Sequence, residues 1–335
     1  MGNIVCCSQA KIFVPGGKKL FQMNRIKCNN DKEPFSESFE KSDLDSQVNS
    51  SSKEGKKLGQ FELISYDLEY DGYFKLNVHI PVIKDLEGLS EVNMKGNLYL
   101  CGTNPDSNGA ENEGGFLFKI SPGQSMAQIL INSKFSHVNP SLICDDNNNF
   151  IYCIGGHNQV KCEVYDVAVS KWISLPDLEE ERYKSSLIIF NKFELTSTPH
   201  LYLFGGLNSK SRAIEQSILK LNLNDPSKWE KIEAQDPSFI PRISAGCVAF
   251  KNSDEIFVFG GETVDGEMLD DVIKFNTRNN KYSYTGNKLK NKTKFINLNG
   301  MELTENIYYF IDYFNQAHDF HRTDFMMMAE NEMSH

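Results

Sequence analysis

The chain has no run of about 18 or more apolar residues, the length that suggests a transmembrane helix. Its N-terminus also lacks the apolar segment that a secretory signal peptide needs. These two absences exclude a membrane-spanning protein of the helical type and a secreted one. We therefore expect a chain that stays in the cytosol.

Cysteine and basic charge are both scarce. Eight cysteines in 335 residues are too few for a disulfide scaffold, and four of them lie in apolar runs, as is typical of small buried thiols. The formal net charge of -10 argues against a nucleic-acid partner, because affinity for phosphates needs clustered Lys and Arg. The expected body of the protein is reduced, acidic and soluble. The four buried thiols are Cys101, Cys144, Cys153 and Cys247.

Motifs of catalysis are missing as well. The sequence has no phosphate loop, no Gly-x-Ser-x-Gly elbow and no His-Glu-x-x-His helix. Cys153, His157 and Cys162 have a spacing that could suggest zinc, but Cys153 lies inside an apolar run and no fourth ligand is evident. We therefore expect no enzyme, no metal and no cofactor.

Two further polar clusters favour structural roles. Residues 145–149 lack the glycine and the terminal Glu of a calcium loop, and predict a hairpin turn instead. His318 and His321 would lie on opposite faces of a regular strand, so the pair does not favour a metal site.

What the chain does contain is an apolar, aromatic segment that recurs five times. The copies begin at residues 98, 151, 201, 256 and 307, so successive starts are 53, 50, 55 and 51 residues apart. Each copy is typical of a strand covered on both faces. Three copies end in Gly-Gly, which permits positive φ and close backbone packing. The copies are Leu98–Gly102, Ile151–Gly156, Leu201–Gly206, Ile256–Gly261 and Ile307–Asp312.

A second element follows each Gly-Gly pair. A strand ends in Asp or Asn, a polar turn follows, and a large aromatic residue begins the next strand, which indicates a hairpin. The residue pairs are Tyr165 with Trp172, Leu223 with Trp229, and Phe275 with Tyr282.

These residues resemble the kelch family, whose units carry Gly-Gly after an apolar strand, then a Tyr and, a few positions later, a Trp. The resemblance covers residues 60 to 325 and implies an all-β, kelch-type β-propeller. Thr103 replaces the second glycine of the first copy, and Ile311 and Asp312 replace both in the last. The matching residues are Gly155, Gly156, Tyr165 and Trp172; Gly205, Gly206 and Trp229, with Leu223 in place of Tyr; Gly260, Gly261, Phe275 and Tyr282; and Arg182 and Arg242, which resemble the family's arginine before the innermost strand.

The two ends of the repeat are incomplete. Residues 63–67 and 73–76 reproduce only the second half of a unit, and only 317–321 follow the last copy. One blade assembled from both ends would close the ring and leave no sheet edge. Five blades result if the N-terminal hairpin completes the fifth unit, and six if it has a sheet of its own. An all-β sandwich with chance spacing is the other arrangement considered.

The first eight residues resemble the start of N-myristoylated proteins, with Gly2 exposed once Met1 is removed. Cys6 stands where Ser or Thr is usual, and together with Cys7 it offers sites for palmitoylation. One acyl chain holds a protein only marginally at a bilayer, so a second signal is required. A basic segment adds attraction to an anionic membrane. Its cations are Lys11, Lys18, Lys19, Arg25 and Lys27.

The composition divides the chain into three parts. We expect residues 1–58 to be a disordered tail, made of the acylated, basic membrane-targeting part and a Ser-rich tether. Residues 59–328 would form the propeller, and 329–335 a C-terminal tail.

The expected function is that of a membrane-tethered scaffold for protein–protein interaction on the cytoplasmic face. Its recognition surface would be the loops Thr103–Gly115, Leu207–Ser217 and Glu262–Asp271, because loops vary while blades are constrained by packing. The kelch resemblance implies that cytoskeletal proteins are among the candidate partners. The alternative is an enzyme or a small-sugar binder that uses the central channel, where titratable side chains from several blades would have to meet.

Overall fold

The computed structural model describes residues 19–25, 60–67, 72–81, 88–103, 114–145, 149–191, 198–233, 240–250, 253–294, 301–304, 307–311 and 317–321. This described part contains 22 β-strands and no helix. The expectation of an all-β protein is confirmed. The five apolar copies correspond in order to β5 (Asn97–Gly102), β9 (Phe150–Gly156), β13 (His200–Phe204), β17 (Glu255–Phe259) and β21 (Ile307–Ile311).

The strands form six antiparallel sheets within the described residues. Two sheets have three strands: β1 (Lys19–Arg25), β2 (Gln60–Asp67) and β3 (Gly72–His79); and β20 (Met301–Thr304), β21 (Ile307–Ile311) and β22 (Ala317–His321). Four sheets have four strands: β4 (Leu89–Met94), β5 (Asn97–Gly102), β6 (Phe116–Ile120) and β7 (Gln128–Ile129); β8 (Ser141–Asp145), β9 (Phe150–Gly156), β10 (Gln159–Asp166) and β11 (Lys171–Leu175); β12 (Ser186–Phe190), β13 (His200–Phe204), β14 (Ile218–Asn222) and β15 (Trp229–Ile232); and β16 (Gly246–Ala249), β17 (Glu255–Phe259), β18 (Asp271–Asn276) and β19 (Lys281–Lys288).

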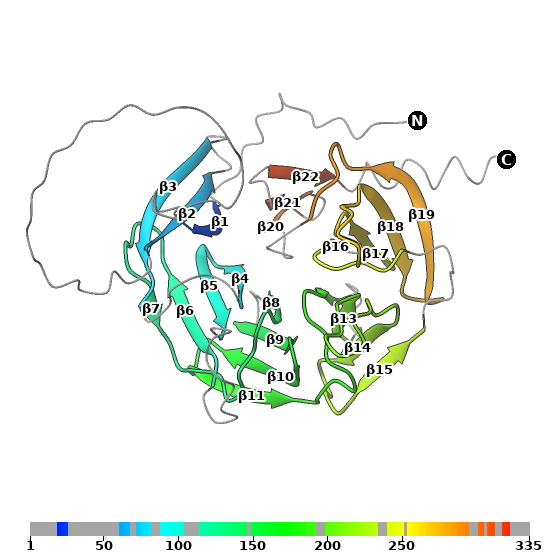
Figure 1. Cartoon of the computed structure of the whole chain (residues 1–335), viewed down its shortest axis with the longest axis horizontal. Helices are drawn as coiled ribbons and strands as arrows, with labels where there is room; N and C mark the ends of the chain where they lie inside the picture. Colours follow the sequence, from blue (N-terminus) through cyan, green and yellow to red (C-terminus); the bar gives the residue numbers. More distant parts are fainter. Residues whose placement is uncertain are drawn as a thin grey trace, which may run out of the picture.

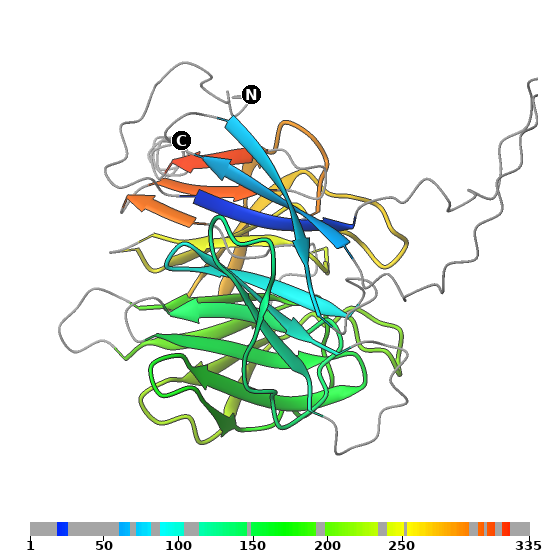
Figure 2. The same cartoon turned by 90° about the vertical axis from the view of Figure 1, so that its left-hand side faces the viewer.

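The sheets are set around a common centre in chain order, which gives a propeller-like arrangement (Figure 1). The first strands of neighbouring four-stranded sheets contact each other: β4 with β8, β8 with β12, and β12 with β16. Figure 2 shows the same sheets from the side, stacked one beside the next. A sheet that is apolar on both faces is buried only between two neighbours, and the radial arrangement supplies both of them.

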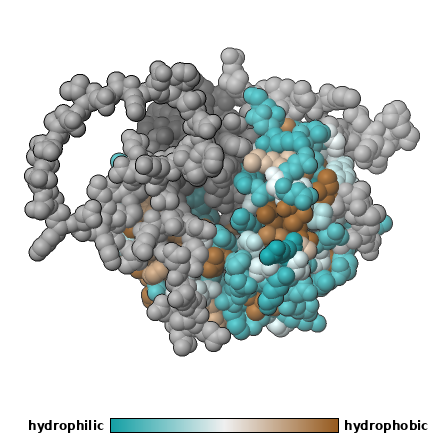
Figure 3. Space-filling model, viewed as in Figure 1, coloured by the Kyte–Doolittle hydropathy of each residue, from teal (hydrophilic) through white to brown (hydrophobic). Residues whose placement is uncertain are grey.

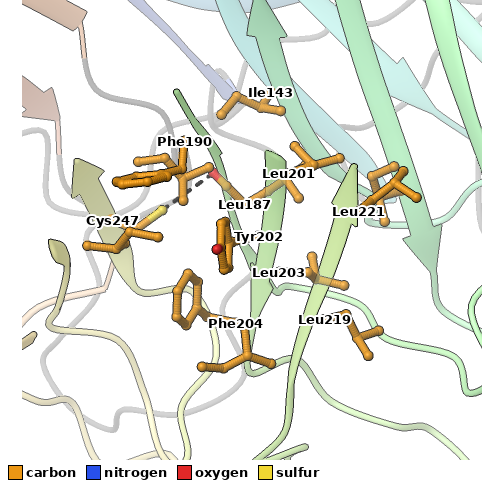
Figure 4. Packing of buried hydrophobic residues seen from close by; sticks show 14 of the residues in the cluster. Ile143, Leu187, Phe190, Leu201, Tyr202, Leu203, Phe204, Leu219, Leu221 and Cys247 are labelled. Atoms are coloured by element: carbon orange, nitrogen blue, oxygen red, sulfur yellow. Dashed lines mark hydrogen bonds between the residues drawn. The ribbon is translucent and has the colours of Figure 1, made fainter. Parts of the chain in front are cut away.

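The hydrophobic core lies between neighbouring sheets. The largest cluster joins the sheets that begin with β8, β12 and β16, and includes Tyr202, Phe204 and Phe275. Figure 4 shows part of this cluster, where Cys247 Sγ donates to the carbonyl of Leu187 at 3.4 Å. In Figure 3, hydrophobic residues gather near the centre of the coloured surface and hydrophilic ones cover most of the rest. The second strands of these sheets are therefore buried on both faces, as their composition predicts.

The segment Lys19–Arg25 differs from the expectation of a disordered tail. It forms β1 and pairs with β2, from Lys19 opposite Asp67 to Arg25 opposite Phe61. Apolar and polar residues alternate at positions 21–24, which fits the period of a strand. The hairpin of β2 and β3 offers an open edge, and pairing satisfies its backbone groups. The other residues of the expected tail lie outside the described ones.

The N-terminal hairpin belongs to a different sheet from the C-terminal strands. β2 and β3 pair with β1, whereas β20, β21 and β22 pair among themselves. The hairpin is tied to the next sheet along the chain: Ala127 N–H donates to His79 O at 2.9 Å, and Phe61 and Val78 pack in one cluster with Phe118. In the described part, the hairpin therefore packs as a layer of its own beside the sheet of β4–β7.

Candidate functional site: the loop face

Two kinds of connection come together on one side of the ring. Loops between the second and third strands of a sheet, and segments leading from one sheet to the next, meet at the same strand ends because the sheets are antiparallel. Isolated bridges join the two kinds, Tyr183 with Leu207 and Ile243 with Glu262. We call this side the loop face. Its described parts include residues 130–140, 157–158, 176–185, 207–217, 240–245, 262–271 and 289–294.

The predicted recognition loops belong to this face. Leu207–Ser217 and Glu262–Asp271 are described throughout, whereas residues 104–113 of the first loop lie outside the described residues. The side chain of Asn208 closes the loop Leu207–Ser217, since its Oδ1 accepts from the N–H groups of Lys210 at 3.0 Å and Ser211 at 3.2 Å. Antiparallel bridges, Leu207 with Ile214 and Glu262 with Met268, make both described loops compact hairpins, and their tips are exposed.

The Gly-Gly pairs let the second strand of one sheet approach the segment that leads into the next. Gly205 has φ of 62°, and a Cβ there would lie 2.1 Å from the carbonyl oxygen of Arg242. The N–H of Gly206 donates to that oxygen at 3.4 Å, and the N–H of Gly156 donates to Arg182 O at 3.0 Å. Only glycine fits where backbones approach this closely at positive φ.

A buried basic side chain precedes the first strand of these sheets. Arg242 donates to Gly260 O at 3.1 Å and to both carboxylate oxygens of Asp271, at 2.7 and 2.8 Å. Arg182 donates to Ser217 O at 2.6 Å and to Ser217 Oγ at 2.7 Å. Each arginine thus fastens the start of the third strand of its own sheet.

His137 occupies the equivalent place before β8, and sequence reasoning missed it. Its Nδ1 lies 2.7 Å from Gly155 O, its Nε2 lies 3.3 Å from Glu163 Oε2, and both side chains are fully buried. A common spacing could have revealed it, because His137 and Arg182 each precede by four residues a serine that begins the innermost strand. Histidine replaces arginine here, so the residue type hid the equivalence.

The aromatic pairs of the repeat join one sheet to the outer part of the previous one. Tyr165 lies opposite Trp172, with ring centroids 5.1 Å apart. The Trp172 indole N–H donates to Ile131 O at 2.8 Å, and that of Trp229 donates to Pro176 O at 2.9 Å. These bonds satisfy the indole groups at equivalent places in successive sheets. Phe275 and Tyr282 form the corresponding pair, 5.3 Å apart, in the sheet of β16–β19.

The prediction that Leu223 replaces the tyrosine of the third unit is wrong. Trp229 lies opposite Leu221, and Leu221 lies opposite Leu201 on its other side. The turn between β14 and β15 is one residue longer than its counterparts, since Trp229 follows Leu221 by eight residues whereas Trp172 follows Tyr165 by seven. Leu223 lies just beyond the end of β14, so Leu221 is the residue that corresponds to Tyr165.

Acidic side chains of Glu262–Asp271 are paired with a lysine-rich segment that leaves the same sheet. The pairs are Lys288 with Asp270 at 3.2 Å, Lys292 with Glu267 at 2.7 Å, and Lys294 with Glu262. Together with Asp271 on Arg242, these contacts satisfy the acids that frame the loop.

The inner strands are linked near the centre of the ring by hydrogen bonds between sheets. Ser141 Oγ donates to Ser185 O at 2.9 Å, and Ser186 Oγ donates to Ala245 O at 2.8 Å. Among the residues that the structure describes, no group of three or more His, Cys, Asp or Glu side chains is placed to hold a metal ion.

The structure does not bring Cys153, His157 and Cys162 together. Cys153 Sγ lies 3.7 Å from Cys101 Sγ in the core between two sheets, whereas Cys162 belongs to the core on the other side. Burial raises the pKa of the Cys162 thiol to about 12. His157 is exposed on the loop face and stacks edge-on against Tyr183, with ring centroids 5.1 Å apart.

The other predicted clusters have the following places. Asp145 ends β8 and lies opposite Phe150 of β9, and residues 146–148 of this cluster lie outside the described part. His318 and His321 belong to β22. Lys19 and Arg25 are the first and last residues of β1. The predicted acylation and basic residues Gly2, Cys6, Cys7, Lys11, Lys18 and Lys27 lie outside the described part.

A comparison with models of known protein families finds no match to this chain, and none of the curated proteins searched matches it. Over the described ranges, no helix combines the length and apolar character needed to cross a bilayer.

Proposed function

We propose that the chain is a kelch-type propeller of six blades that acts as a membrane-tethered scaffold and binds a protein partner through its loop face. The observation that carries the proposal is the loop face itself. Compact loops with exposed tips rest there on buried Gly-Gly and arginine contacts that recur from sheet to sheet. Rigid supports under variable loops are typical of a recognition surface.

The six-blade form is supported by the separate pairing of the two ends. The N-terminal hairpin has β1 as its own third strand and packs on the sheet of β4–β7 through Phe61 and Val78. Six sheets then follow one another around the centre in Figure 1. A five-blade ring would instead need the hairpin to complete the sheet of β20–β22.

The membrane part of the proposal rests on the N-terminal residues alone. Gly2 with Cys6 and Cys7 offers two kinds of acyl attachment, and two signals are what stable anchoring needs. Confinement to a membrane would raise the effective concentration of the loop face toward a partner on the same surface.

Metabolic labelling with an alkyne analogue of myristate tests the anchor. The full chain should take up the label and sediment with membranes, and Gly2→Ala should abolish both. A Cys6→Ser, Cys7→Ser double variant should keep the label and lose stable membrane association. Absence of label on the native chain would remove the membrane part of the proposal.

Two exposed valines on opposite sides of the ring test the docking surface. Val264 is 59% exposed at the tip of the Glu262–Asp271 loop, and Val169 is 66% exposed in the turn between β10 and β11. Proximity labelling in cells should recover a set of partners that Val264→Asp loses and Val169→Asp retains. Equal recovery by both variants would contradict a partner site on the loop face.

A further inference from the structure

Glu181 is a buried carboxylate at the place where three parts of the loop face meet: segment 176–185, the turn at 157–158 and the loop Leu207–Ser217. The side chain is 3% exposed. Its Oε1 accepts from Ser209 Oγ and from the N–H of Lys210 at 3.1 Å. Its Oε2 is buried and has no hydrogen-bond partner among the described residues. A buried charged oxygen without a donor is costly, so this atom calls for an explanation.

The same place holds more acceptors than donors. The hydroxyl of Ser209 faces Glu181 Oε1 and also lies 2.9 Å from Asn158 Oδ1, so one hydrogen serves two acceptors. We call Asn158, Glu181, Ser209 and Lys210 the Glu181 junction. A group that brings several donors at once would complete it.

Two further acids belong to the same segments, Glu180 next to Glu181 in the chain and Glu215 in the loop Leu207–Ser217. The carboxylate of Glu215 lies near Glu180, and burial raises the pKa of Glu215, with Arg182 opposing this shift and Glu180 adding to it. Arg182 lies within the ring and directs its guanidinium to Ser217, with Glu215 at 3.8 Å. Lys210 contacts Glu181 through its backbone N–H.

An aromatic side chain stands beside the junction. Tyr183 follows Glu181 by two residues on the segment 176–185; burial raises its pKa, and the negative charge of Glu181 raises it further. His157 packs edge-on against this ring. Because His157 adjoins Asn158 in the chain, this aromatic pair lies beside the junction, and an aromatic face attracts positive charge.

We propose that the Glu181 junction binds the ammonium of a lysine or the guanidinium of an arginine from a basic segment of a partner protein. These groups carry three and five donors, and a positive charge that matches Glu181. This inference rests on the proposed function, because it identifies the chemistry of the partner that docks on the loop face.

Selection from a displayed library of random dodecapeptides on the immobilised full chain tests the inference. Peptides that bind should carry a Lys or Arg at one recurrent position. Synthetic copies should bind Glu181→Gln at least about tenfold more weakly, which is the effect expected for loss of one charge-assisted hydrogen bond. The glutamine keeps an acceptor for Ser209 and Lys210, so the loop remains tied.

Glu179→Gln is the matched control, since Glu179 is exposed on the same segment 176–185 and the substitution removes the same charge. It should weaken binding by less than about threefold, as expected for an exposed charge. Peptides that lack basic residues, or that bind Glu181→Gln equally well, would overturn the inference. If those peptides were still lost in Val264→Asp, the proposed docking face would stand.

Stability supplies an independent readout. Glu181→Gln should raise the melting temperature, because it removes a buried charge that lacks a donor. A lower melting temperature would show that Oε2 is already satisfied in the folded chain, and would overturn the inference even if peptides were selected. Selection of no peptide at all would contradict the proposed function as well as this site.

Discussion

Two neighbouring sheets present the same architecture on the loop face but settle their charges differently. In the sheet of β16–β19, four of the five acids of the loop Glu262–Asp271 have a cation: Arg242 binds Asp271 through two hydrogen bonds, and lysines of segment 288–294 pair with three further acids. In the sheet of β12–β15, Arg182 binds Ser217 instead, Glu215 is 3.8 Å away, and Glu181 keeps an oxygen without a donor.

We infer from this difference that one loop is mainly a rigid support, whereas the other is suited to bind a partner. A loop whose charges are satisfied internally has little left to offer a ligand other than its shape and its exposed tip. A loop with an excess of acceptors carries a cost in the free chain that a donor from outside can relieve. The same scaffold can therefore hold one rigid loop and one loop suited to binding.

The largest effect should come from Arg242, with Arg182 as its comparison. Arg242→Met leaves Asp271 without its bidentate partner, and should lower the free energy of unfolding by about 3–5 kcal/mol. Arg182→Met removes hydrogen bonds to Ser217 and should cost about 1–3 kcal/mol. Urea unfolding of both variants measures the difference. Equal losses would break the distinction between the two sheets.

A smaller effect is expected from glycine substitutions, which compare a glycine of the shared scaffold with a glycine at a loop tip. Gly205→Ala places a Cβ 2.1 Å from Arg242 O at positive φ and should cost about 3 kcal/mol. Gly266→Ala, at the tip of the other loop, has φ of 81° and open space around it, and should cost about 1–2 kcal/mol. Thermal unfolding compares them. A harmless Gly205→Ala would show that the close approach to Arg242 is not needed.

The smallest effect should differ in sign between the two loops. Because burial raises the pKa of Glu215, the folded chain binds its proton more readily than the unfolded chain, so its contribution to stability falls as pH rises above the ordinary Glu pKa. Glu215→Gln should remove this loss and stabilise the chain at pH 7 by less than about 1 kcal/mol. Glu262→Gln, which breaks the pair with Lys294, should instead destabilise it by about 0.2–1 kcal/mol.

Unfolding of both variants in urea at about pH 4 and at pH 7 measures this contrast. The gain of Glu215→Gln over the native chain should shrink at the lower pH, where the native carboxyl is protonated as well. A gain that does not change with pH would mean that Arg182 offsets the burial of Glu215 in full.

Strand positions were predictable because they depend on local composition. All five apolar copies are the second strand of a sheet, and the buried side chains of β5, β9, β13 and β17 agree with apolar runs covered on both faces. The pairing of Tyr165 with Trp172 and of Phe275 with Tyr282 was also correct. These features need only a strand, a turn and a following strand.

Features that depend on register and on neighbouring sheets were not predictable. The strand register places Trp229 opposite Leu221, eight residues before it, and not opposite a residue near Leu223. His137 took the place of an arginine, and Lys19–Arg25 became a strand because a hairpin edge was available to it. Glu181 belongs to a run of acidic residues, a composition typical of an exposed segment, yet the loop Leu207–Ser217 covers its side chain.

The sequence by itself determined a repeat of about 50 residues, in which each unit contains a short apolar strand and three units carry a glycine pair at its end. A strand that is buried on both faces needs apolar residues wherever it occurs. Only the tertiary structure decided which carboxylates meet a cation and which do not. Those contacts join residues from different loops and sheets, and a carboxylate's surroundings follow from where the backbones converge.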